Sequence, residues 1–68
     1  MSKLSINITI GNRNYPLTIE REEEELIREA AKRVNDNMKQ LGSTYAVNDK
    51  QDLLAMTALF FSNKALEV

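Results

Sequence analysis

Residues 48–68 read NDKQDLLAMTALFFSNKALEV, and this segment constrains the fold more than any other. If it is helical, with about 100° between successive residues, its apolar side chains lie on two opposite sides of the helix. One side carries Leu54, Ala58, Phe61, Ala65 and Val68, and the other carries Leu53, Met56, Leu59 and Phe60. A helix that is apolar on two sides needs two surfaces to pack on. The segment therefore favours a contact with a partner, although a central core helix in a very small domain is the alternative.

The size of the chain favours the same interpretation. A domain of 68 residues is marginally stable without reinforcement. The sequence contains no cysteine and no histidine, which excludes disulfides and any thiolate or imidazole metal site. We therefore expect a single domain over residues 1–68 that is stabilised by association with a second copy.

Residues 4–19 predict a β-hairpin. The apolar side chains alternate in both strands, on either side of a turn at residues 11–14: Leu4, Ile6, Ile8 and Ile10, then Tyr15, Leu17 and Ile19. Pro16 cannot donate a ladder hydrogen bond, so its nitrogen should lie on the outer side of the second strand or at a bulge. Two strands alone are marginal in water, so the hairpin needs a helix to pack on.

Residues 22–41 predict that helix. Its apolar side chains fall within one arc of about 140°; they are Leu26, Ile27, Ala30, Ala31, Val34, Met38 and Leu41. Glu24–Arg28 and Glu29–Arg33 are i,i+4 pairs in the favourable order. We expect Gly42 to end the helix as a C-terminal cap, and we find no convincing N-cap before Glu22.

A second helix is expected over residues 49–68, with Asn48 as its N-cap. No stop signal follows Leu66, so we expect this helix to continue in the native protein. The predicted fold class is α+β, a β-hairpin followed by two α-helices (ββαα), with the second helix long and forming a homodimer interface. Leu53, Met56, Leu59 and Phe60 are expected to meet their symmetry mates there in an isologous contact.

The sequence offers no group of residues suited to catalysis, and we expect no enzymatic activity, no cofactor and no metal. The serine and threonine hydroxyls have no histidine to activate them. Consecutive glutamates, as in Glu22 to Glu25, point in different directions around a helix, so they predict a solvated helix start. The net charge of −1 leaves no basic surface for nucleic acid, and no segment approaches the length of a membrane span.

Arg13 is the residue for which a functional role is easiest to argue. It lies at the predicted tip of the hairpin, where a turn needs glycine and asparagine but has no steric reason for arginine. The alternative is a generic exposed charge.

Several segments together resemble the head domain of the ZapA family, small bacterial division proteins that associate with the tubulin-like GTPase FtsZ. The segments are Ile10-Gly11-Asn12-Arg13-Asn14-Tyr15, Ala31-x-x-Val34-Asn35-x-x-Met38 and Asp52-Leu53-Leu54-Ala55-Met56-Thr57-Ala58-Leu59. The resemblance covers Leu4 to Leu66.

The resemblance implies a non-enzymatic cytoplasmic adaptor at the division septum that bridges FtsZ filaments. Its head domains would dimerise, and the second helix would continue into a coiled coil that pairs dimers into a tetramer. The surface that contacts FtsZ would include Arg13 and Gln51, although the family often carries an acidic residue where this chain has Gln51. The alternative hypothesis is a small homodimeric DNA-binding or antitoxin-like regulator, against which the lack of a basic stripe counts.

Overall fold

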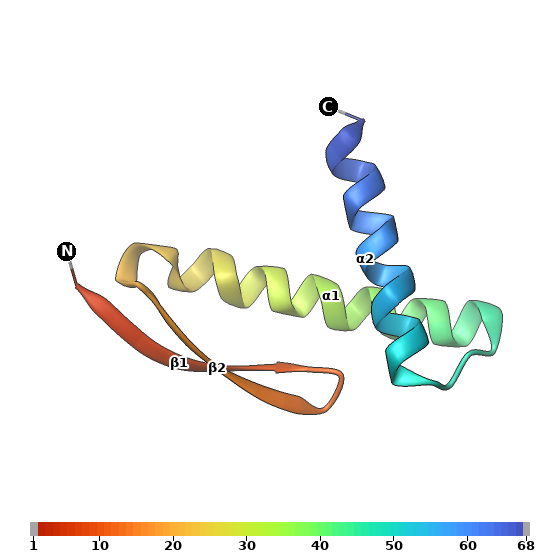
Figure 1. Cartoon of the computed structure of the whole chain (residues 1–68), viewed down its shortest axis with the longest axis horizontal. Helices are drawn as coiled ribbons and strands as arrows, with labels where there is room; N and C mark the ends of the chain where they lie inside the picture. The colour runs from red at the N-terminus through yellow and green to blue at the C-terminus, as the bar shows by residue number, and fades with distance from the viewer. Residues whose placement is uncertain (1, 68) are drawn as a thin grey trace. The chain divides into compact units, whose positions relative to one another are not determined.

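The computed structural model describes residues 2–67 and contains one hairpin followed by two helices (Figure 1). The elements are β1 (Lys3–Ile10), β2 (Arg13–Glu20), the short 3-10 helix η1 (Arg21–Glu23), α1 (Glu24–Tyr45) and α2 (Lys50–Leu66). This order confirms the predicted ββαα arrangement of the α+β class. The chain divides into two compact units, residues 1–35 and residues 36–68, and α1 contributes to both.

The strands pair in the register that their apolar residues require. Leu4 lies opposite Ile19, Ile6 opposite Leu17 and Ile8 opposite Tyr15, so the apolar side chains of both strands share one face of the sheet. The turn is shorter than predicted: only residues 11–12 separate the strands, and residues 13–14 already belong to β2.

Pro16 lies opposite Asn7 in this register. The pair that closes a two-residue turn, here Ile10 and Arg13, is hydrogen-bonded, and such pairs alternate with non-hydrogen-bonded ones along an antiparallel ladder. Counting from the turn, Asn7 and Pro16 form a non-hydrogen-bonded pair. The proline nitrogen therefore faces outward, as expected, and costs the hairpin no ladder bond.

The core of the first unit lies between the sheet and the beginning of α1. Ile6, Ile8 and Ile19 are its buried residues, and four partly buried side chains pack against them: Leu4, Ile10, Ile27 and Ala31. The contact face of the helix is narrower than predicted, because Leu26 at the margin of the arc is 74% exposed. The predicted ion pairs on the outer surface are present, with Arg28 to Glu24 at 3.0 Å and Arg33 to Glu29 at 3.3 Å.

Both ends of α1 differ from the prediction. At its start, Glu20 caps the preceding 3-10 turn in a reciprocal capping box with Glu23, which the sequence analysis did not predict. At its end, Gly42 does not stop the helix, which continues to Tyr45. Ala46 then takes the left-handed conformation, with φ 54°, that a C-terminal glycine usually adopts.

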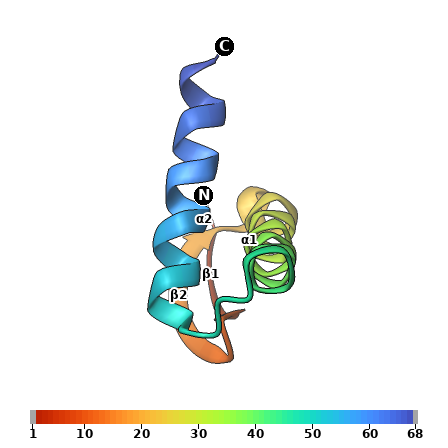
Figure 2. The same ribbon diagram turned by 90° about the vertical axis from the view of Figure 1, so that its right-hand side faces the viewer.

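Position 42 lies within the helix, and a glycine fits there because neighbouring atoms occupy the space that a side chain would need. A Cβ atom at this position would approach the carbonyl oxygen of Val47 to 3.1 Å and the Leu53 side chain to 3.7 Å. The loop after α1 and the first turns of α2 thus pack close to the backbone of α1. The non-helical connection between the two helices is visible in Figure 2.

In the second unit, α2 begins after Asp49, not after the predicted Asn48. The Asp49 carboxylate accepts hydrogen bonds from the backbone N–H groups of Gln51 and Asp52 at 2.8 and 3.3 Å. The buried residues of α2 are Leu53 and Thr57, and Met38 is the buried residue of α1. Thr57 is therefore part of the core, although its hydroxyl marks it as polar in the sequence.

Candidate functional site

The turn of the hairpin determines where Arg13 lies. Gly11 and Asn12 have φ angles of 57° and 70°, which are typical of a type I′ turn. This turn matches the twist of the flanking strands, and glycine and asparagine adopt its positive φ angles with the least strain. Arg13 is consequently the first residue of β2 and lies directly beside the turn, paired with Ile10.

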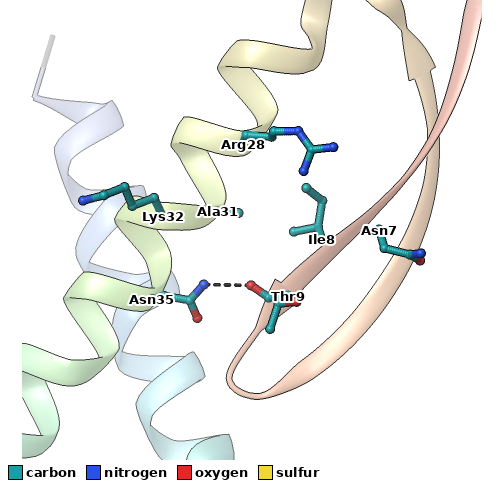
Figure 3. Close-up of a pocket in the computed structure, with 7 residues that line it drawn as sticks. All are labelled: Asn7, Ile8, Thr9, Arg28, Ala31, Lys32 and Asn35. Carbon is teal, nitrogen blue, oxygen red and sulfur yellow. Dashed lines mark hydrogen bonds between the residues drawn. The ribbon is translucent and has the colours of Figure 1, made fainter.

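Hydrogen bonds fasten this turn on two sides. Asn35 of α1 donates from Nδ2 to the carbonyl oxygen of Thr9 at 2.7 Å, as Figure 3 shows, and its Oδ1 accepts from the N–H of Gly11 at 3.0 Å. Between the strands, the hydroxyl of Thr9 donates to Oδ1 of Asn14 at 2.6 Å. Arg13 therefore projects from a turn whose backbone is held both within the hairpin and by the helix.

The side chain of Arg13 is exposed, and over residues 2–67 its guanidinium group forms no hydrogen bond or ion pair. In this it differs from Arg28 and Arg33, which are paired with glutamates on α1. A guanidinium group offers a planar fork of N–H donors that matches the geometry of a carboxylate. The hairpin tip can therefore present a cation to an acidic surface of a partner.

Gln51, the other residue expected to contact a partner, lies in the first turn of α2. Its backbone N–H is held by the N-cap Asp49, and its side chain is exposed. Arg13 belongs to the first unit and Gln51 to the second. The structure thus provides two exposed polar side chains, each on a locally capped or fastened element.

An apolar groove of about 420 Å³ lies in the second unit. Its lining combines the end of α1 with one side of α2: Leu41, Tyr45, Met56, Leu59, Phe60 and Asn63. Tyr45 and Leu59 are 62% and 72% exposed, and Phe60 is 41% exposed. Large side chains so exposed to water on neighbouring turns are typical of a surface that is covered by a partner.

The four residues predicted to form the dimer interface do not all lie in this groove. Met56, Leu59 and Phe60 line it, whereas Leu53 is only 6% exposed and packs beside Gly42 inside the unit. Leu53 is buried because it lies one helical turn before Thr57, on the side of α2 that the chain itself covers. Leu53 packs α2 against the rest of the second unit, and Met56, Leu59 and Phe60 line the open groove.

A second, more polar groove of about 380 Å³ lies in the first unit, between β1 and α1 (Figure 3). Ile8 and Ala31 supply its apolar part, and its polar lining consists of Asn7, Thr9, Arg28, Lys32 and Asn35. The figure shows Asn35 pointing toward β1 and Lys32 pointing away from the strand. Arg28 is paired with Glu24, and Asn35 connects the helix side of this groove to the hairpin through its hydrogen bond to Thr9.

Over residues 2–67 no cluster of acidic side chains could hold a metal ion. The same residues contain no helix that is both long and apolar enough to span a membrane. The described surface has two features suited to binding a partner protein, the cationic hairpin tip and the apolar groove.

Asn35 is the residue whose role the sequence did not reveal. It appears in the sequence as one member of a spaced motif on the first helix, with no function attached. The signal that could have found it is its spacing, because Asn35 lies four residues after Ala31 and thus on the face of α1 that packs on the sheet. A polar residue on that face needs a hydrogen-bond partner, and the hairpin backbone that faces it can supply one.

Comparison with known proteins identifies one family. The family model described as "Cell division protein ZapA" matches residues 6–68. No curated protein and no solved structure gives a significant match. The matched region contains the hairpin tip, both helices and the apolar groove, so the chain belongs to the ZapA family of cell division proteins.

Proposed function

We propose that this protein is a non-enzymatic adaptor that binds FtsZ and promotes the association and bundling of FtsZ filaments at the division ring. The observation that carries the proposal is the fastened tip, where Arg13 is exposed and unpaired over the described residues, in a chain of the ZapA family. The family match also favours an adaptor over the DNA-binding or antitoxin-like regulator that a small homodimer could otherwise be.

Arg13 and Gln51 are the proposed contacts to FtsZ. Arg13 supplies a charged fork of donors, and Gln51 supplies a neutral amide that can both donate and accept. A single exposed ion pair contributes little, about 0.2–1 kcal/mol. Binding through such contacts is therefore weak at each head, strongly dependent on salt, and in need of more than one head for each particle.

The second head is supplied by a homodimer. The groove lined by Met56, Leu59 and Phe60 is the proposed interface, in which α2 of one copy packs against its symmetry mate. A dimer carries two hairpin tips and can therefore contact two filaments. A coiled coil that continues from α2 would join dimers into a tetramer and extend the span between the tips.

The adaptor acts in the cytoplasm, at the septum, because FtsZ filaments assemble there. It needs no cofactor and no nucleotide of its own. Its contribution is geometric: it holds neighbouring filaments together, and GTP hydrolysis remains a property of FtsZ.

Co-sedimentation with GTP-polymerised FtsZ tests the proposal. The full-length protein is expected to pellet with the filaments at low ionic strength, and Arg13→Ala should reduce the pelleted fraction several-fold. Arg21→Ala is the matched control, since Arg21 is an exposed arginine that follows the other end of β2. Failure of the wild-type protein to pellet, or equal losses in both variants, would contradict the proposed binding site.

A further inference from the structure

We infer that Asn35 is a positioning residue for Arg13, because its side-chain amide holds the hairpin turn in the conformation that presents the guanidinium to a partner. The inference rests on the proposed function. It concerns two hydrogen bonds of Asn35, one to Thr9, which Figure 3 shows, and one to Gly11, and both cross from α1 to the hairpin within the first unit.

The geometry of β1 explains why an amide is needed at this position. Ile10 uses its backbone groups to pair with Arg13, so the neighbouring carbonyl of Thr9 and N–H of Gly11 point to the outer edge of the strand. Asn35 donates to the first and accepts from the second, as a neighbouring strand would. Of the side chains with this length, only asparagine offers a donor and an acceptor together; aspartate lacks the donor and leucine lacks both.

These two bonds act on Arg13 through its own strand pair. Thr9 and Gly11 flank Ile10, and Ile10 is the residue opposite Arg13. The tip of a two-stranded hairpin is the part that opens first, since few buried contacts hold it. Asn35 links this tip to a helix that is already packed on the sheet through Ala31, one turn earlier. Without the link, the turn is free to move and Arg13 samples directions that a partner cannot use.

The hydrogen-bond part of the inference is tested on the chain alone. Amide hydrogen exchange at Gly11 should be about 3- to 10-fold faster in Asn35→Leu than in the wild-type protein, as expected for the loss of one hydrogen bond. Gln40→Leu is the matched control, because Gln40 is an exposed amide residue on the same helix. Equal exchange rates at Gly11 in the wild-type protein and Asn35→Leu would overturn the inference.

The positioning part is tested by a double-mutant cycle on FtsZ affinity at low ionic strength. Asn35→Leu should weaken binding about 2- to 5-fold when Arg13 is present, no more than the loss of Arg13 itself, and should have almost no further effect in an Arg13→Ala background. Equal losses in both backgrounds would show that Asn35 acts only on general stability, and would overturn the role. The melting temperature of each variant separates this role from unfolding.

The two proposals fail in different ways. If the wild-type protein does not bind FtsZ, the proposed function fails, whatever the exchange rate at Gly11. If the wild-type protein binds and Arg13→Ala weakens it, while Asn35→Leu binds as tightly as Gln40→Leu, only the role of Asn35 fails.

Discussion

Replacing Thr57 by valine should stabilise the chain. Thr57 is 2% exposed in the core of the second unit, and its hydroxyl oxygen finds no hydrogen-bond partner among residues 2–67. A buried hydroxyl that bonds to nothing has lost its hydration without compensation. Valine has nearly the same shape, and it replaces the hydroxyl by a methyl group that needs no partner.

The size of the effect follows from two terms of the same sign. An unsatisfied buried polar group costs about 1–3 kcal/mol, and burying one more methyl group contributes up to about 0.8 kcal/mol. The helix propensities of threonine and valine are similar, so the backbone adds little to the difference. We therefore expect Thr57→Val to raise the free energy of unfolding by about 1–4 kcal/mol.

Thermal unfolding followed by circular dichroism, at one fixed protein concentration, measures this change. A gain of 1 kcal/mol corresponds to a rise of about 4–8 °C in Tm for a domain of this size. Thr57→Ser is the matched control, because it keeps the hydroxyl and removes the methyl group, and it should lower Tm. If Thr57→Val instead melts below the wild-type protein, the hydroxyl has a partner after all and the reasoning is refuted.

Other substitutions test the remaining features. Asp49→Ala should cost about 1 kcal/mol of stability by removing the N-cap of α2; in the same denaturation assay Asn48→Ala should cost little, and the reverse order would restore the sequence-based assignment. Ala46→Gly should stabilise by up to about 1 kcal/mol, since Ala46 is exposed with φ 54°; a lower Tm would argue against that strain. Leu59→Asp should convert dimers to monomers in sedimentation velocity, whereas the equally exposed Leu26→Asp should not.

The hairpin was predictable because its alternation is strict and its strands have one apolar face each. The period of 2 fixed which residues face the core, and the register then followed from the need to align the two apolar faces. The turn was predicted two residues too long, because asparagine at position 14 is a turn former that here bonds across the strands to Thr9.

The end of α1 was not predictable from Gly42. A glycine after a run of helical residues usually marks a C-terminal cap, yet here it provides space for Val47 and Leu53. That requirement comes from the return of the chain, which local propensity does not contain. The same applies to Thr57, because its burial depends on which side of α2 the unit covers.

The candidate site was predicted in part. Arg13 was identified because a turn has no need of an arginine. Asn35 was not identified, because its hydrogen-bond partners lie 24 and 26 positions away in the sequence and such distant bonds leave no local pattern. The dimer interface on α2 stays a prediction, but Leu53, which was assigned to it, is buried within the single chain. Leu53 is 6% exposed, so the chain itself covers this residue.

Sedimentation of FtsZ filaments at two speeds separates binding from bundling, because low speed pellets only bundles and high speed pellets single filaments as well. The wild-type protein should move FtsZ into the low-speed pellet. Leu59→Asp, if it dissociates the dimer, should still pellet with filaments at high speed and leave them unbundled at low speed. If the wild-type protein leaves FtsZ in the low-speed supernatant, or if the monomeric variant bundles filaments equally well, the protein is not an adaptor that joins filaments through paired heads.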